Sequence, residues 1–357
     1  MRYKLHYEPL YEYEAISMLK NILNGRSIKD SRNERIARHG SRYKAAITRF
    51  FKNAIALENY VGKHVTYNMP GYETTGKQIA AFLFTENETL NAAFADALYF
   101  YRLLLQNGID NKEFALLAGL DEKRFDRYET EGAPPVIKPG QEFFTILDSC
   151  PVTDKDKFDT VKLYYNFDMY QAYLTALVAQ VKDLILEKWA NPVEETAPVM
   201  DRIAALIDKN GTAFSHEYFH VTLDDTHDLM LYPSLYNTTS MYSTGYGDVL
   251  ITFGLHIFEA HELISEAAHE ATQTEAFLKC LSDSTKLSII KLLRNETMYV
   301  GQLAEALNCT SANISHHASA LLSLDIIYMK KESNRMYLHL NKETIARCFD
   351  EAKGLFL

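Results

Sequence analysis

The feature that most constrains the fold lies near the C-terminus, where helical and strand periodicities follow one another in a fixed order. Three stretches carry apolar residues at helical spacing, and two further stretches alternate with the period of a strand. The predicted elements are helices at residues 284–294, 300–307 and 311–324, and strands at residues 326–331 and 335–340. The turn Asn308-Cys309 separates the second helix from the third, and Thr310 is placed to cap the third. This order predicts a cluster of three short helices followed by a hairpin.

The third helix of this cluster combines a buried apolar face with polar residues near its N-terminus. Ile314, Ala318 and Leu321 recur at the spacing of one helical face, so we expect them in the core, together with Leu322. The polar residues are Thr310, Ser311, Asn313, Ser315, His316 and His317. Two short helices joined by a tight turn, with polar residues at the start of the second, place hydrogen-bonding groups in a DNA major groove. We therefore predict that these residues bind DNA.

The hairpin that follows carries cations at its tip. Lys330, Lys331, Asn334 and Arg335 surround the turn Glu332-Ser333-Asn334. Cationic and amide side chains on such a hairpin are suited to contacts with DNA phosphates or with the minor groove. We predict that these four residues also bind DNA.

The ordered segments resemble a known family. LSDSTKLSIIKLL, VGQLAEAL, SANISHHASALLSLDII and a basic hairpin ending in MYLHL are together similar to the winged helix-turn-helix of the ArsR-type bacterial transcriptional repressors. The resemblance covers residues 275–340 of the 357. It implies a homodimer that binds double-stranded DNA at a palindromic operator, with a recognition helix at Ser311–Leu324 and a wing at Lys330–Arg335.

The metal sites of the family have no counterpart in this sequence. Where metal-sensing members carry Cys-x-Cys, this chain has Tyr299-Val300-Gly301, and the C-terminal segment Asn341–Leu357 contains no histidine. We therefore expect no metal and no cofactor. A small-molecule effector is compatible with the resemblance, but the sequence does not identify one.

The region before the motif has mixed periodicity. Residues 10–210 have mostly helical spacing, whereas alternation at 219–223 and 229–232 predicts a hairpin, and alternation at 249–257 predicts a further strand. We expect an α+β fold that is mostly α. A helical N-terminal domain with a small antiparallel β-sheet, residues 1–257, would precede a linker helix and the winged helix-turn-helix, residues 258–357.

Charge is unevenly distributed along the chain. The whole chain has 37 Lys+Arg and 47 Asp+Glu, a formal charge of −10. Residues 271–357 hold 10 basic and 9 acidic residues, a balance of 10 − 9 = +1, so the acidity lies in the N-terminal part. Within that part, the segment Lys20–Lys52, here called the basic segment, has ten basic residues and two acidic ones. It is either a solvated helical face or a surface that contacts phosphates.

A competing motif lies at residues 216–220, which read HEYFH. On a helix, H-E-x-x-H supplies two zinc ligands and the general base of a zinc hydrolase. The alternation that continues from Tyr218 to Leu223 favours a strand, in which residues four apart are separated by about 13 Å, too far to share one zinc ion. We therefore expect histidines on the solvent side of an edge strand, with a zinc-dependent hydrolase as the alternative.

Taken together, these patterns predict a transcription regulator rather than an enzyme. The sequence has no apolar run of the roughly 18 residues that a membrane helix requires and no apolar export signal, so we expect a cytoplasmic protein that does not bind membranes. We expect a sequence-specific repressor whose N-terminal domain supplies dimerisation or effector sensing. A protein-interaction module that binds no DNA is the second alternative for the helical cluster.

Overall fold

The computed structural model describes residues 3–356 except 40–42, 87–92, 121–134, 212, 215–220, 223–228, 245–248, 271–272 and 333–334. By its internal contacts the chain divides into two compact units. The large unit consists of Tyr3–Met200 and Leu229–Ile257, and the C-terminal unit is built mainly from Asp201–Asp228 and Phe258–Leu357. The expected division into domains at residue 257 stays a prediction.

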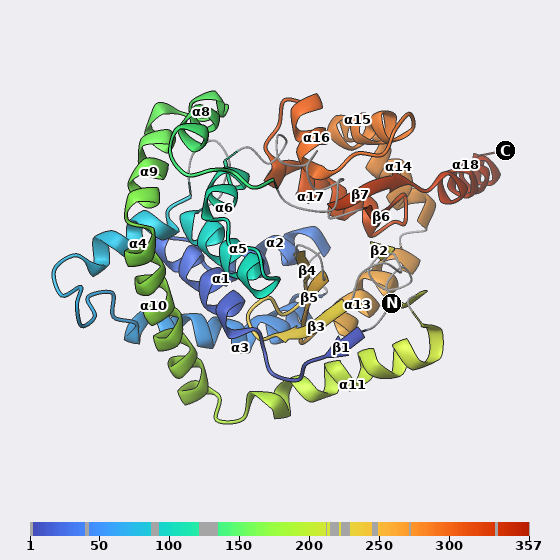
Figure 1. The fold of residues 1–357 in the computed structure, drawn as a ribbon. Coiled ribbons are helices and arrows are strands. Elements are labelled where there is room, and N and C mark those ends of the chain that lie inside the picture. The colour runs from blue at the N-terminus through green and yellow to red at the C-terminus, as the bar shows by residue number, and fades with distance from the viewer. Residues whose placement is uncertain are drawn as a thin grey trace. The chain divides into compact units, whose positions relative to one another are not determined.

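The large unit contains a four-stranded sheet in the order β1-β3-β5-β4 (Figure 1). The strands are β1 (Tyr3–Leu5), β3 (Leu229–Ser234), β4 (Met241–Thr244) and β5 (Val249–Gly254). β3 runs parallel to both β1 and β5, whereas β4 runs antiparallel to β5. The N-terminal strand therefore joins a sheet whose other strands lie more than 220 residues later in the chain.

The strand β5 was predicted, but its sheet is mixed rather than antiparallel. One antiparallel pair, β4 with β5, agrees with the expectation, and the two parallel pairs correct it. The predicted hairpin between 219–223 and 229–232 is wrong, because β2 (Val221–Thr222) pairs with a strand of the C-terminal unit. Alternation identifies a strand but not its partner. Burial on both faces, as at Ile251 and Thr252, is the mark of a parallel strand.

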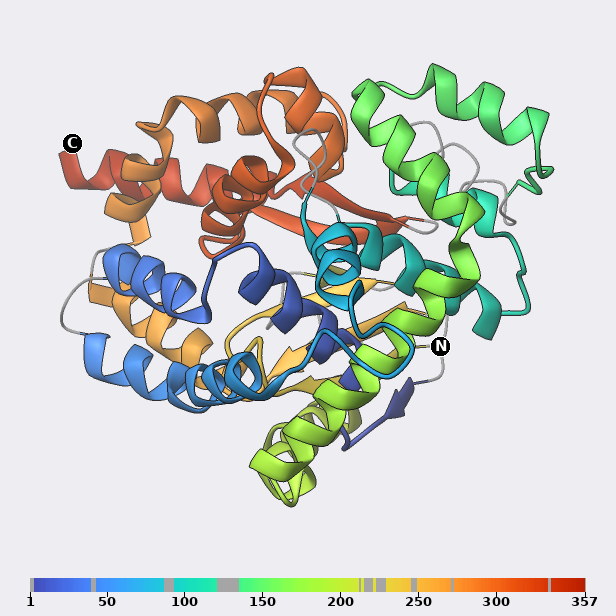
Figure 2. The ribbon, with the colours of Figure 1, turned by 90° about the vertical axis from the view of Figure 1, so that its left-hand side faces the viewer.

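The helices of the large unit pack around this sheet and on one another (Figures 1 and 2). They are α1 (Tyr11–Leu23), α2 (Ile28–His39), α3 (Lys44–His64), α4 (Gly76–Phe84), α5 (Phe94–Gln106), α6 (Lys112–Ala118), α8 (Gln141–Ser149), α9 (Asp154–Tyr165), α10 (Phe167–Lys188) and the first part of α11 (Pro192–Asn210), which continues into the C-terminal unit from Asp201. Large aromatic side chains fill the interior, among them Phe51, Phe84 and Tyr173, each less than 2 % exposed. The Tyr173 hydroxyl donates to the Gly76 carbonyl at 2.7 Å, which satisfies its polar end.

Two buried carboxylates hold the segment after β3 against the helices. Glu14 on α1 accepts hydrogen bonds from the backbone N–H groups of Leu235, at 3.2 Å, and Tyr236, at 2.8 Å. The Tyr236 hydroxyl in turn donates to Glu58 on α3. At the end of β5, the backbone of Gly254 packs directly against the backbone of the segment after β3. A Cβ on Gly254 would lie 2.2 Å from the Asn237 carbonyl oxygen. Only glycine fits there.

The C-terminal unit contains the predicted helices and hairpin. Its elements are β2, α13 (Ile257–Glu270), α14 (Gln273–Leu281), α15 (Ser284–Leu293), α16 (Val300–Ala306), α17 (Ser311–Leu322), β6 (Ile327–Glu332), β7 (Arg335–Leu340) and α18 (Lys342–Phe356). Their shared core includes Ile289, Leu303, Ile314 and Leu321, all fully buried. The expected fold class, α+β and mostly α with a C-terminal winged helix-turn-helix, is confirmed.

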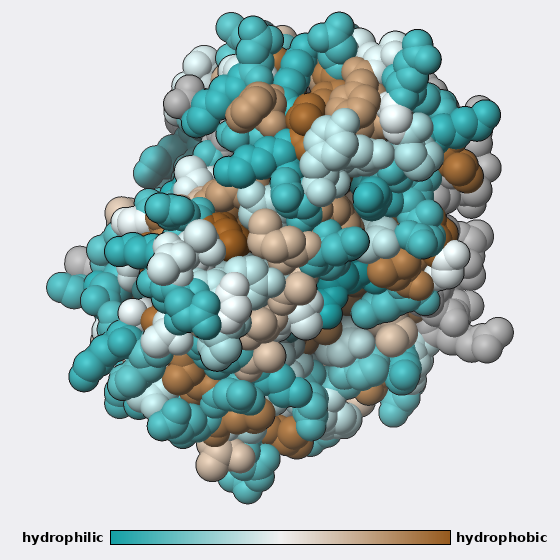
Figure 3. Space-filling view, turned by 60° about the vertical axis from the view of Figure 1, so that its left-hand side comes forward, coloured by the Kyte–Doolittle hydropathy of each residue, from teal (hydrophilic) through white to brown (hydrophobic). Residues whose placement is uncertain are grey.

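The expected linker helix at the start of residues 258–357 corresponds to two helices, α13 and α14. Residues 271–272 between them lie outside the described residues, so the continuity of this linker stays a prediction. None of the described helices is long and apolar enough to cross a membrane. On the face shown in Figure 3, hydrophobic residues form small groups separated by hydrophilic ones.

Candidate nucleic-acid interface

The turn between α16 and α17 sets the direction of the second helix. Asn308 has a φ of 52°, in the left-handed region that asparagine tolerates better than most residues. The Cys309 N–H donates to the Ala304 carbonyl at 2.8 Å and closes the end of α16. The chain can therefore begin α17 at Ser311, two residues after Cys309. This confirms the turn that was predicted at Asn308-Cys309.

The beginning of α17 is fixed by its cap and by its buried face. Thr310 Oγ1 accepts a hydrogen bond from the Asn313 N–H at 3.2 Å, which confirms the predicted cap. Ile314, Ala318 and Leu321 are buried, at 0 %, 3 % and 0 % exposure. With one face anchored in the core, the first turns of α17 present their other residues outward.

Five of the six polar residues predicted on this helix lie together on the surface. Thr310, Ser311, Asn313, Ser315 and His316 are all exposed and occupy the cap and the first two turns of α17. Their hydroxyl, amide and imidazole groups include both hydrogen-bond donors and acceptors. A helix that presents such groups at its N-terminal end can read base edges in a major groove.

His317 lies differently from its neighbours. Its side chain is 16 % exposed, and its Nδ1 lies 3.7 Å from Asp283 Oδ1. Asp283 caps α15 by accepting from the N–H groups of Thr285 and Lys286, at 3.0 Å each. The hydrogen bond from the Lys286 backbone and the charge of Lys286 lower the pKa of Asp283. The ring of His317 thus faces the capped end of α15 instead of the outer face of α17.

The wing brings together only part of the predicted set. Lys330 and Arg335 are half-buried, and the Arg335 guanidinium lies over the Tyr299 ring at 4.4 Å. Lys331 is 4 % exposed. Asn334 lies outside the described residues. Strand alternation explains the difference, because Lys331 shares a face with Ile327, which packs in the core, whereas Lys330 is on the opposite face. The period of the strand therefore predicts the burial of Lys331, whereas its charge alone does not.

The wing also belongs to a larger sheet than the sequence predicted. β6 and β7 form the expected antiparallel hairpin, with Ile327 opposite Leu340. β2 pairs in parallel with the other side of β6, so that Thr222 is opposite Lys330. On the side of β7, the Leu338 N–H donates to the Met298 carbonyl at 2.8 Å. A two-residue strand and an isolated bridge have no periodicity that a sequence pattern could reveal.

The HEYFH motif at residues 216–220 lies outside the described residues. In the part of the chain that the structure describes, no three His, Cys, Asp or Glu side chains are grouped as metal ligands. The zinc-hydrolase alternative therefore stays a prediction. Zinc analysis of the purified protein and of a His216→Ala variant tests it directly.

A capped α17 with an exposed polar face, placed after α16 and followed by a β-hairpin, defines a winged helix-turn-helix DNA-binding module. Comparison with known proteins agrees with this class. The family model described as "Bacterial regulatory protein, arsR family" matches residues 283–328, from the cap of α15 into β6. The transcriptional repressor SdpR of Bacillus subtilis (strain 168) is 33 % identical over 63 residues, which cover 18 % of this chain and 70 % of SdpR. No solved structure was found to match.

The chain therefore belongs to the arsR family of bacterial regulatory proteins. It is a DNA-binding transcription regulator. The family match lies entirely within the C-terminal unit, so the large unit is an addition that this match does not describe.

Proposed function

We propose that the protein is a repressor that binds a palindromic operator as a homodimer, and that its large unit modulates this binding. The exposed polar start of α17 is the observation that carries the proposal, because it presents base-reading groups on an anchored helix. The similarity to SdpR, which is described as a transcriptional repressor, favours repression over activation.

We divide the ten predicted DNA-binding residues by role, using the exposure of the nine that the structure describes. We assign base contacts to Ser311, Asn313, Ser315 and His316, and phosphate contacts to Thr310, Lys330, Arg335 and Asn334. His317 and Lys331 are less exposed, so we assign them the positioning of α17 and of the wing. The assignments predict different consequences for specific and for non-specific binding.

Substitution of the two groups should therefore have separable effects. Asn313→Ala and His316→Ala should each cost about 1–3 kcal/mol on the operator and little on unrelated DNA, since only base contacts distinguish sequences. Lys330→Ala and Arg335→Ala should weaken binding to all sequences and reduce the salt slope by about one each. Titrations of operator and scrambled duplexes at several salt concentrations measure both effects. Equal losses on both duplexes from all four variants would contradict the assignment of base-reading residues.

The chain path supports modulation by the large unit. The chain passes between the units near residues 200, 228 and 257, so covalent connections at these points join them. The segment between the first two connections supplies β2, which is part of the wing sheet. A change in the large unit can thus reach the wing through a continuous stretch of backbone.

Dimerisation is supported by an exposed aromatic side chain. Phe349 on α18 is 52 % exposed, and its ring contacts the buried Phe277 of α14 edge-on at 5.0 Å. We place this ring in the contact between two copies of the C-terminal unit. Two copies would present two recognition helices to successive major grooves, about 34 Å apart.

A further inference from the structure

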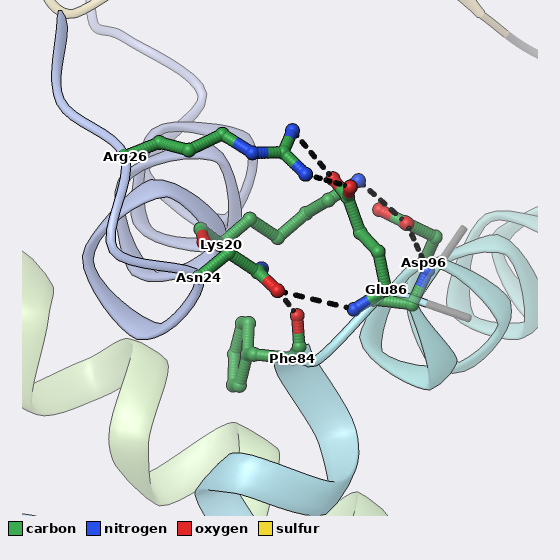
Figure 4. A network of polar contacts seen from close by, with 7 residues as sticks. Lys20, Asn24, Arg26, Phe84, Glu86 and Asp96 are labelled. Atoms are coloured by element: carbon green, nitrogen blue, oxygen red, sulfur yellow. Dashed lines mark hydrogen bonds and ion pairs between the residues drawn. The ribbon is translucent and has the colours of Figure 1, made fainter. Parts of the chain in front are cut away.

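The basic segment divides into two parts once its contacts are known. In the first part, Lys20 Nζ lies 2.7 Å from Asp96 Oδ2, and the Arg26 guanidinium pairs with Glu86 (Figure 4). Arg35 donates to the loop that precedes β4. These three cations therefore hold α1 and α2 to other parts of the large unit. Their presence in the segment is explained by folding.

The second part of the segment lies on α3, whose exposed face is basic. α3 is described throughout, and Figure 2 shows it beside α2, against which it packs. Its exposed residues are Lys44, Ala45, Thr48, Arg49, Lys52, Asn53, Ala56, Asn59, Gly62, Lys63 and His64. Four of them are Lys or Arg, and none of these exposed residues is acidic. We call Lys44, Thr48, Arg49 and Lys52, which lie in the N-terminal half, the α3 basic face.

The one acidic residue of α3 does not balance this charge at the surface. Glu58 is 5 % exposed and accepts a hydrogen bond from the Ile28 N–H at 3.0 Å, and its other partners include Tyr236. Its carboxylate therefore accepts hydrogen bonds inside the large unit and does not lie at the surface of α3. Among the described residues, Lys44, Arg49 and Lys52 have no ion pair.

The acids on neighbouring elements leave the face basic. On α2, Asp30 accepts the Ser27 N–H at 3.0 Å, and Glu34 is exposed. On α10, Glu187 bonds to Tyr60, which lies eight residues beyond Lys52, about 12 Å along α3. Asp30 and Glu187 thus have hydrogen-bond partners of their own, and among the described residues neither forms an ion pair with a cation of the face.

The position of these cations also opposes the stability of the helix. A helix N-terminus carries partial positive charge, so acidic residues are favoured there and basic ones are not. The first turn of α3 has no acidic residue, and its N-cap Tyr43 makes no capping hydrogen bond through its side chain. Lys44 therefore adds a cation to an end of the helix that is already electropositive. A binding role explains this placement, whereas helix stability does not.

We propose that the α3 basic face binds the phosphate backbone of double-stranded DNA without regard to sequence, and so adds affinity to the winged helix. This inference rests on the proposed function. Phosphate contacts supply much of the affinity of DNA-binding proteins, yet residues 271–357 have a balance of only +1. Lys44 and Lys52 are about 12 Å apart along the helix, which at about 3.4 Å per phosphate corresponds to three to four phosphates of one strand. The Thr48 hydroxyl between them can donate to a phosphate oxygen.

The test is a triple substitution, Lys44→Gln, Arg49→Gln and Lys52→Gln, in the full chain. Operator and scrambled duplexes are titrated at several salt concentrations. We expect affinity for both duplexes to fall by the same factor, about tenfold or more at low salt, and the salt slope to decrease by about 2 to 3. The matched control is Lys77→Gln, Lys138→Gln and Lys155→Gln, three exposed lysines elsewhere in the large unit, which should change neither quantity. Thermal unfolding verifies that both variants are folded.

The outcomes separate this inference from the proposed function. If the wild type prefers its operator and the triple variant keeps both the wild-type affinity and the wild-type salt slope, the α3 basic face does not bind DNA while the regulator function stands. If the control loses as much affinity as the triple variant, the effect is one of net charge and the inference is also overturned. If the wild type binds no DNA even at low salt, the proposed function itself fails.

Discussion

Glu14 shows how a buried residue makes the stability of the large unit depend on pH. Its side chain is fully buried, and this burial raises its pKa from 4.5 to about 7, against the opposing effect of its hydrogen bonds. The folded protein then holds the proton more tightly than the unfolded chain does. The contribution of Glu14 to stability is therefore complete below pH 4.5 and is lost as the pH rises through about 7.

The variant Glu14→Gln should remove this dependence, because the amide is neutral at every pH and keeps one acceptor for the Tyr236 N–H. Between about pH 5 and about pH 8, the unfolding temperature of the variant should rise relative to that of the wild type. Glu8→Gln, at an exposed position, is the control and should show a constant difference. Parallel curves for Glu14→Gln and wild type would contradict the buried-carboxylate explanation.

Individual residues show which features of the DNA-binding site can be predicted from the sequence. The cap Thr310, the turn residue Asn308 and the buried face of α17 were all predicted, because each depends on neighbours within a few positions. His317 and Lys331 were placed with the exposed residues, and the structure finds them facing Asp283 and on the buried face of β6. For Lys331 the strand period contained the answer. For His317 the deciding contact is with a helix 34 positions earlier in the chain.

At the scale of elements, β2 is the unexpected component of the wing sheet. It adds a parallel strand to β6, opposite Met329 and Lys330. Thr222→Pro removes a backbone donor and disfavours strand pairing. We predict faster amide hydrogen exchange for Met329–Lys331 in this variant, with unchanged exchange in α15 and α17. Thr222→Val, which favours a strand, is the matched control. Unchanged exchange in β6 of the proline variant would show that β2 does not stabilise the wing.

The contrast between the two sheets explains how much of the fold could be predicted. The hairpin β6–β7 and the three helices before it arise from neighbouring segments, so caps, turns and periodicity located them within a few residues. The pairs β1–β3 and β2–β6 join segments more than 100 residues apart. The local sequence pattern of Tyr3–Leu5 or of Val221–Thr222 does not indicate which strand it pairs with. The mixed direction of the large unit's sheet could not be inferred for the same reason.

At the scale of the whole molecule, the chain joins a small family module to a much larger unit. The family match spans residues 283–328, whereas the large unit supplies most of the chain and most of its acidic charge. A net charge of −10 repels DNA as a whole, so binding depends on where the cations lie. The start of α17, the wing and the α3 basic face are the surfaces on which we place that contact.

The central claim is sequence-specific binding of DNA by the winged helix. The most direct measurement is fluorescence anisotropy of the purified protein with the DNA upstream of its own gene and with a scrambled duplex, over roughly 50 to 300 mM salt. We predict a preference of about a hundredfold or more for the upstream DNA, with two chains bound per duplex. Equal affinity for both duplexes at every salt concentration, or no binding to either, would contradict the claim.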